Sequence, residues 1–327
     1  MSKSALNLIF KILGSIIILL LLFSFIEFDK DSFFNIISQL NLPLYFFSLT
    51  GVIVVLGIKS YRWHLIIKHQ GFRYPVGKSF GAYMASFTIG LITPGRIGEI
   101  ARLYYMRQEN EIEFIPAFRT VVIDRIFDLG MLILLGFAAL LFYTSIGITN
   151  PYLAIAIASI TFFTGLLFID WMLKKIIRIK RFANNQIIQF IISCVSQAVN
   201  RHSFVLWAIT LIAYLAFYGA ISLIFLSLDI QMPLVDIALI LSVVGLATIL
   251  PFSFAGFGTR EMSLVFLLSY YSISSEIALS FSLLQFTAFF LWGGFIGLVF
   301  WLLMPISLQQ IKSDSLTLAS LLKKKRN

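Results

Sequence analysis

Six stretches of predominantly apolar residues dominate this chain, each close to the roughly 20 residues that a helix needs to cross a bilayer. They are the ranges 5–26, 43–67, 118–143, 151–170, 203–226 and 277–304. Hydrophobic residues make up 59% of the 327 positions and charged residues only 12%, too few to cover the surface of a water-soluble globule. The sequence therefore predicts an all-α, polytopic membrane protein without a soluble domain.

Basic residues gather in alternate loops between these stretches. They are Lys59, Arg62, Lys68, Arg73 and Lys78 in loop 59–78, then Lys174, Lys175, Arg178, Lys180, Arg181 and Arg201 in loop 171–201, and finally Lys323, Lys324, Lys325 and Arg326. Lys30 is the only lysine or arginine in the intervening segments 27–42, 144–150, 227–233 and 271–276. By the positive-inside rule, we expect a multi-pass protein of the cytoplasmic (inner) membrane with both termini in the cytoplasm. The net charge of +10 therefore lies beside the membrane and indicates no nucleic-acid partner.

Two further segments begin apolar and are then interrupted by proline and glycine. The interrupting residues are Pro94, Gly95 and Gly98 in the segment at about 76–107, and Pro251, Gly256 and Gly258 in the segment at about 234–271. The loop charges are consistent only if each segment returns to the side of the membrane from which it enters. Both segments are therefore predicted to be re-entrant hairpins.

With these hairpins, the order of elements repeats with reversed direction. Residues 1–148 form helix, helix, cytoplasmic hairpin and helix, and residues 149–305 form the same four elements inverted. Residues 306–327 then form a basic cytoplasmic tail. This order predicts an inverted-topology repeat, which in transporters places the binding site at the interrupted helices.

Each hairpin turn carries an arginine and a glutamate. These are Arg96 and Glu99 in the first hairpin, and Arg260 and Glu261 in the second. Proline and glycine interrupt helical hydrogen bonding, and free N–H groups beside a guanidinium are well suited to hold a phosphate. The alternative interpretation is a structural helix break in which the arginine and the glutamate simply pair.

The third span contains two aspartates that are expected to lie near the middle of the membrane. Asp124 and Asp128 are one helical turn apart and would repel each other, so a cation is expected between them. Arg96 or Arg102 from the first hairpin is the predicted cation, and Arg125 can also reach Asp128 at i+3 spacing. A purely architectural cluster of salt bridges is the alternative.

Together, these motifs resemble the flippase-like family, the transmembrane region of lysylphosphatidylglycerol synthases. The motifs that carry the resemblance are Pro94-Gly95-Arg96-Ile97-Gly98-Glu99 with Arg102, Asp124-Arg125-Ile126-Phe127-Asp128, and Pro251 followed by Gly256-Phe257-Gly258-Thr259-Arg260-Glu261. This chain resembles a stand-alone member, since about 20 residues follow the last span and an aminoacyl-transferase domain would need many more. Asp124 stands where the family often has glutamate, and Gln285 where members often have arginine.

The resemblance implies movement of a polar-headed lipid between leaflets, without catalysis, metal or cofactor. The lipid would be a phospholipid or a polyprenyl-phosphate-linked glycan. The expected headgroup ligands are Arg96, Arg102, Arg125 and Arg260, and the expected charge-balancing or proton-carrying residues are Glu99, Asp124, Asp128 and Glu261. One alternative is a partner that presents lipid to a glycosyltransferase or another lipid-modifying enzyme. A membrane-embedded enzyme acting on lipid phosphates is the other.

Overall fold

All secondary structure in the described part of the chain is helical, as predicted. The computed structural model describes residues 29–91, 93–110, 112–144, 150–177, 186–200, 203–249 and 256–305. The helices are α2 (Lys30–Ser38), α3 (Leu42–His69), α4 (Val76–Leu91), η1 (Pro94–Ala101), α5 (Arg102–Asn110), α6 (Phe114–Tyr143), α7 (Pro151–Ile177), α9 (Gln186–Val199), α10 (Ser203–Ser227), α11 (Leu234–Ile249), α12 (Thr259–Ser269), α13 (Ser275–Phe286), η2 (Thr287–Trp292) and α14 (Gly293–Leu303). Of these, η1 is a 3-10 helix and η2 is a π-helix.

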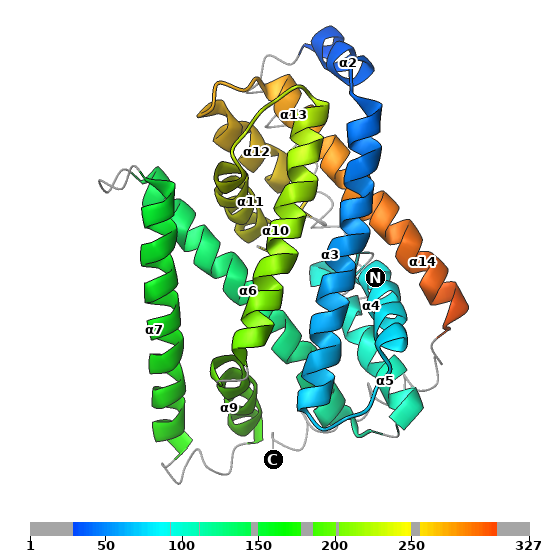
Figure 1. Cartoon of the computed structure of the whole chain (residues 1–327), viewed down its shortest axis with the longest axis vertical. Helices are drawn as coiled ribbons and strands as arrows, with labels where there is room; N and C mark the ends of the chain where they lie inside the picture. Colours follow the sequence, from blue (N-terminus) through cyan, green and yellow to red (C-terminus); the bar gives the residue numbers. More distant parts are fainter. Residues whose placement is uncertain are drawn as a thin grey trace, which may run out of the picture.

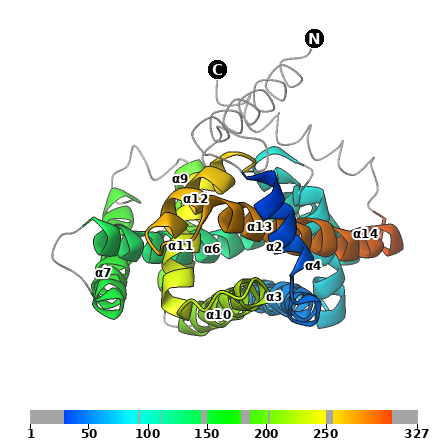
Figure 2. The same cartoon turned by 90° about the horizontal axis from the view of Figure 1, so that it is seen from above.

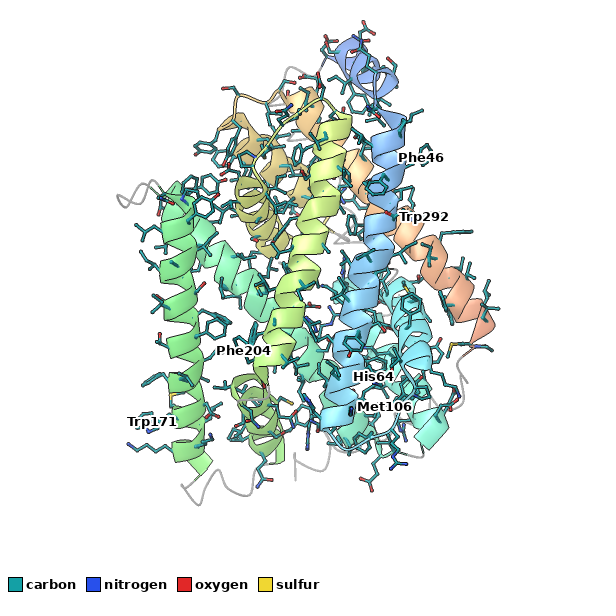
Figure 3. The ribbon with its side chains drawn as sticks, in the orientation of Figure 1. Phe46, His64, Met106, Trp171, Phe204 and Trp292 are labelled. Atoms are coloured by element: carbon teal, nitrogen blue, oxygen red, sulfur yellow. The ribbon has the colours of Figure 1, made fainter. Side chains whose placement is uncertain are left out.

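Five helical stretches of the described residues are long and apolar enough to cross a membrane. They are Leu42–His69, Phe114–Tyr143, Pro151–Lys175, Ser203–Ser227 and Ser275–Leu303, the last formed by α13, η2 and α14 together. These match five of the six predicted spans, while the predicted span 5–26 lies outside the described residues. Phe46 on α3 and Trp171 on α7, both labelled in Figure 3, are exposed apolar side chains of the kind that lipid covers.

Helices α3 and α10 pack along each other (Figure 1) and lie together on one face of the bundle in the view from above (Figure 2). In the view from above, α7 and α14 lie at opposite edges of the bundle (Figure 2). Helices α3 and α10 can approach closely because Gly51 of α3 has no side chain. A Cβ built on Gly51 would lie only 2.5 Å from the Cβ of Ala220 on α10. Small residues at such a crossing are the usual means of packing helices within a bilayer.

The first interrupted segment forms a hairpin, as predicted, in which η1 and α5 fold back against α4. It connects the ends of α3 and α6 that lie at the bottom of Figure 1. The hydroxyl of Thr93 accepts a hydrogen bond from the N–H of Gly98 (2.7 Å) and donates one to the carbonyl of Ile89 (3.0 Å). A Cβ at Gly98 would lie 2.3 Å from that carbonyl oxygen, so the turn requires glycine there. Pro94 and Gly95 lie in η1 as well.

The second interrupted segment also forms a hairpin, with α12 packed against α11. It connects α10 to α13 at the opposite end of the molecule, the top of Figure 1. Gly256 and Gly258 adopt φ values of +83° and +84°, a left-handed region that favours glycine. The predicted break at Pro251 lies outside the described residues.

Two predicted loops contain helices. The range 27–42 includes α2, which Asp29 caps by accepting a hydrogen bond from the N–H of Asp31 (2.9 Å). The range 171–201 includes α9, whose Cys194 is buried. These helices were missed because both are shorter than a membrane span, and because the basic residues between 174 and 181 obscure the apolar periodicity that follows them.

Candidate functional site

Two buried aspartates near the middle of α6 form the centre of the candidate site. Asp124 and Asp128 are the eleventh and fifteenth of the 30 residues of α6. Asp124 is fully buried and Asp128 nearly so. Because a single charge at this depth costs on the order of 3 kcal/mol, each aspartate needs a partner.

The cation between the two aspartates is Arg62 of α3. Its Nε donates to Oδ1 of Asp124 (2.8 Å) and its Nη2 to Oδ1 of Asp128 (3.0 Å). Its Nη1 donates to the hydroxyl of Thr210 on α10 (2.9 Å), so three spanning helices meet at one guanidinium. A shared cation was predicted correctly, but its identity was wrong, because neither Arg96 nor Arg102 lies between the two carboxylates.

Arg62 was missed because it was counted with the basic loop 59–78. In the structure, α3 continues to His69, which places Lys59 and Arg62 inside the helix. The predicted span 43–67 already included both residues, and their i+3 spacing places them on one face. Two cations one turn apart inside an apolar span are the signal that could have identified these functional residues.

Arg102 of α5 binds Asp124 from the other side. Its Nη2 lies 2.7 Å from Oδ2 of Asp124. The Cζ of its guanidinium lies 5.2 Å from the centre of the Trp63 ring and 4.7 Å from the centre of the Tyr83 ring. Asp124 and both of its arginine partners are completely buried. This triad fits the architectural interpretation, since burial shields its charged groups from a ligand.

The outer part of the network is formed by Lys59 and Arg125 around Asp128. The Nζ of Lys59 lies 3.0 Å from Oδ1 of Asp128, and Nη1 of Arg125 lies 3.8 Å from Oδ2, the i+3 pair that was predicted. The side chains of Lys59 and Arg125 are 20% and 31% exposed, in contrast to the buried triad. They can therefore contact a bound molecule.

The first hairpin joins the network through Glu99. Its carboxylate forms one ion pair with Arg125, through Oε2, and another with Arg96, whose Nη1 lies 3.8 Å from Oε1. Arg96 has a φ of +56°, which is unusual for a residue other than glycine, and its side chain is 51% exposed. Sterically strained backbone of this kind often occurs at ligand sites.

The second hairpin holds a separate and electrically balanced pair. Arg260 and Glu261 form an ion pair, and Ser282 of α13 joins it by accepting from Nε of Arg260 (2.9 Å) and donating to Oε1 of Glu261 (2.8 Å). The remaining oxygen of Glu261 caps α12 by accepting from the N–H of Gly258 (2.7 Å). Ion pairs between described residues do not join this pair to the first hairpin, although both arginines were predicted to bind one headgroup.

Gln285 lies on α13, which also contributes Ser282 to the second pair. Its Oε1 is buried and has no hydrogen-bond partner among the described residues. The helix changes to the π-helical η2 two residues later, a type of distortion that is frequent at functional sites. Among the described residues, no group of three or more His, Cys, Asp or Glu side chains is arranged to hold a metal ion.

These features define an α-helical membrane protein in which a buried ion network connects spanning helices to an interrupted hairpin. The chain belongs to the family described as the lysylphosphatidylglycerol synthase TM region, which it matches over residues 8–312.

Two known proteins are similar to this chain over different lengths. A UPF0104 membrane protein of Methanocaldococcus jannaschii is 24% identical over 305 residues, which cover 84% of this chain and 90% of that protein. The glycosyltransferase AglD of Haloferax volcanii is 29% identical over 72 residues, which cover 22% of this chain and only 12% of that protein.

Proposed function

We propose that this protein moves lipids with polar headgroups between the two leaflets of the membrane. The observation that carries the proposal is the ion network halfway along α6, in which Lys59, Arg96 and Arg125 remain partly exposed. Charges at this depth are expensive unless they are paired or reached by water, and intramembrane charges commonly line transport pathways. The buried triad of Arg62, Asp124 and Arg102 then holds the frame, and the outer residues contact the headgroup.

The arrangement of the hairpins supports this proposal. One hairpin lies between α3 and α6 and the other between α10 and α13, at opposite ends of the α3–α10 pair (Figure 1). This is the order expected if residues 1–148 and 149–305 are inverted repeats. Such repeats allow a site to open alternately to either side by rocking of one half against the other.

The proposed orientation places both termini in the cytoplasm of a cell whose inner membrane holds the protein. Lys78 on α4 and Lys174 on α7 support this orientation, because both are exposed and lie at the ends of their helices where headgroups and water would reach them. The ion network is then entered through the first hairpin from the cytoplasmic side. The second hairpin faces the opposite leaflet.

A second candidate function is supported by the short match to a glycosyltransferase. The protein would then present a lipid to such an enzyme without moving it across the membrane. A lipid-phosphate enzyme is less well supported, because Asp124, Asp128 and Glu99 are all paired with arginines that would repel a catalytic metal.

Transport can be tested in liposomes with fluorescent lipids labelled on an acyl chain, which leaves each headgroup unchanged. A membrane-impermeant reductant added outside bleaches the outer leaflet only, so slow bleaching of the remainder reports the flip rate. Vesicles that contain the protein should exceed protein-free vesicles for at least one lipid class, among zwitterionic, anionic diester and phosphomonoester lipids. If vesicles with the protein bleach no faster than protein-free vesicles for any lipid class, the proposal is contradicted and the presenting function is favoured.

A further inference from the structure

The ion network of the first half has an excess of positive charge. Its ion pairs join five cationic side chains to three carboxylates of the described residues, which leaves two positive charges without a counter-charge. The cations are Lys59, Arg62, Arg96, Arg102 and Arg125, and the carboxylates are Glu99, Asp124 and Asp128. A cluster that serves only as architecture needs equal numbers of positive and negative charges, as in the pair of one arginine and one glutamate formed by Arg260 and Glu261.

The excess lies at the exposed side of the network. Arg62 and Arg102 are fully buried and share Asp124. Lys59, Arg96 and Arg125 are partly exposed, and Arg125 is close enough to repel each of the other two. Arg125 thus repels both of the other two, and the exposed side of the network on which these three cations lie, its opening, favours an anion.

Arg96 is the residue best placed to receive that anion. Glu99 is shared between Arg96 and Arg125, and its contact with Arg96 is the longer one. The guanidinium of Arg96 lies 5.9 Å from the centre of the Phe87 ring, which gives it an apolar support on one side. Its remaining N–H donors can therefore bind a phosphate in the two-pronged geometry that guanidinium groups favour.

We infer that this opening binds the phosphate of a lipid phosphomonoester, a headgroup that carries two negative charges. The inference rests on the proposed function and specifies its substrate class. A monoester dianion neutralises the excess completely, whereas a phosphodiester leaves one positive charge and a zwitterionic headgroup leaves both. A lipid is the source of the phosphate rather than the free ion, because the network lies halfway along a spanning helix.

The inference is tested by binding of short-chain lipids to the purified protein in detergent, measured by calorimetry at pH 8. The probes are dihexanoyl phosphatidate, dihexanoyl phosphatidylglycerol and inorganic phosphate. Phosphatidate should bind at least roughly tenfold more tightly than the diester, since one charge-assisted hydrogen bond contributes that much. Inorganic phosphate should bind more weakly than phosphatidate. Equal affinity for monoester and diester would overturn the inference, and tighter binding of free phosphate would overturn the lipid source.

Charge-neutralising variants test which residues create the preference. The double variant Lys59→Gln/Arg96→Gln removes the excess and should lose the preference for phosphatidate over phosphatidylglycerol. Lys78→Gln removes one cation of the same hairpin that pairs with Glu109 outside the network, and it should bind like the wild type. If the double variant does not fold, Arg96→Gln alone, at a half-exposed position, should lose part of the preference. An unchanged preference in a folded variant would overturn the inference.

Acidity provides an independent measurement. The second pKa of a phosphomonoester is about 6, so the ligand loses one negative charge as pH falls from 8 to 5. Phosphatidate binding should therefore weaken over this range. Phosphatidylglycerol keeps its single charge and reports any titration of Lys59, Glu99 and Asp128 themselves. Parallel pH dependence for both lipids would contradict the inference.

Binding and transport separate this inference from the function on which it rests. Preferential binding without flipping would reject the transport function and keep the phosphomonoester site. Flipping at equal rates for monoester and diester lipids would keep the transport function and reject the phosphomonoester preference.

Discussion

At the scale of single residues, the two aspartates of α6 have different surroundings although they are one turn apart. Asp124 is enclosed by Arg62 and Arg102, both fully buried, whereas Asp128 also contacts the partly exposed Lys59 and Arg125. Removal of a buried charge partner typically costs about 3–5 kcal/mol, because the remaining charge stays desolvated. We therefore assign a mainly structural role to Asp124 and a role at the opening to Asp128.

This assignment predicts different stabilities for two matched variants. Asp124→Asn should lower the free energy of unfolding by about 3 kcal/mol or more. Asp128→Asn should lower it by clearly less, because water can reach two of its partners, Lys59 and Arg125, and Asp124 still neutralises Arg62. Thermal unfolding in detergent, followed by tryptophan fluorescence, measures both. An Asp128→Asn protein that is as unstable as Asp124→Asn would contradict the division of roles.

The sequence predicted the acidic pair and the i+3 contact of Arg125, because both follow from spacing within one helix. It did not identify Arg62 as the shared cation, since that contact joins residues 62 positions apart in the sequence. The local pairing of Arg260 with Glu261 was foreseen only as an alternative interpretation, and the part of Ser282 was not predicted, because Ser282 reaches the pair only after α13 packs against α12. Pairing between elements depends on packing, which single-chain patterns do not encode.

At the scale of elements, the close packing of α3 against α10 depends on the absence of a side chain at Gly51. Gly51→Ala places a methyl group 2.5 Å from the Cβ of Ala220, so the helices must separate or shift. Overpacking of this kind typically costs about 1–3 kcal/mol. Because Arg62 on α3 also binds Thr210 on α10, the shift should disturb the ion network as well.

The variant Gly219→Ala, at the position next to Ala220 on α10, provides the control for Gly51→Ala. A Cβ at Gly219 on α10 would meet nothing within 4 Å, so this substitution should leave the melting temperature unchanged or raise it slightly. Gly51→Ala should lower it. Equal melting temperatures for the two variants would show that the close contact does not hold the helix pair together.

The spanning helices and both hairpins were predictable because their signals are local. Long apolar runs mark the spans, and glycine and proline mark the breaks. The positive φ values of Gly256 and Gly258 and the tight contact at Gly98 give the physical reason for those glycines. The short helices α2 and α9 were missed because they are too short to be recognised as spans and lie in polar surroundings.

At the scale of the whole molecule, the two halves differ in charge more than in order of elements. The first half holds a charged network with an excess of cations, and the second holds a balanced pair with Gln285 nearby. If the halves are inverted repeats, they share a fold but not a binding chemistry. The proposed transport then uses one charged hairpin to hold the headgroup and the other to allow movement.

The most direct test compares flip rates of two single-charge variants in the same vesicle preparation. Arg125→Gln changes the residue that joins Glu99 to Asp128, and Lys78→Gln changes an exposed cation of the same hairpin outside the network. The lipid is the class that the wild-type protein moves fastest, and reconstituted protein is quantified in each sample. The account predicts at least a roughly tenfold slower rate for Arg125→Gln, equivalent to one charge-assisted hydrogen bond, and an unchanged rate for Lys78→Gln. A folded Arg125→Gln protein that flips lipid at the wild-type rate would contradict it.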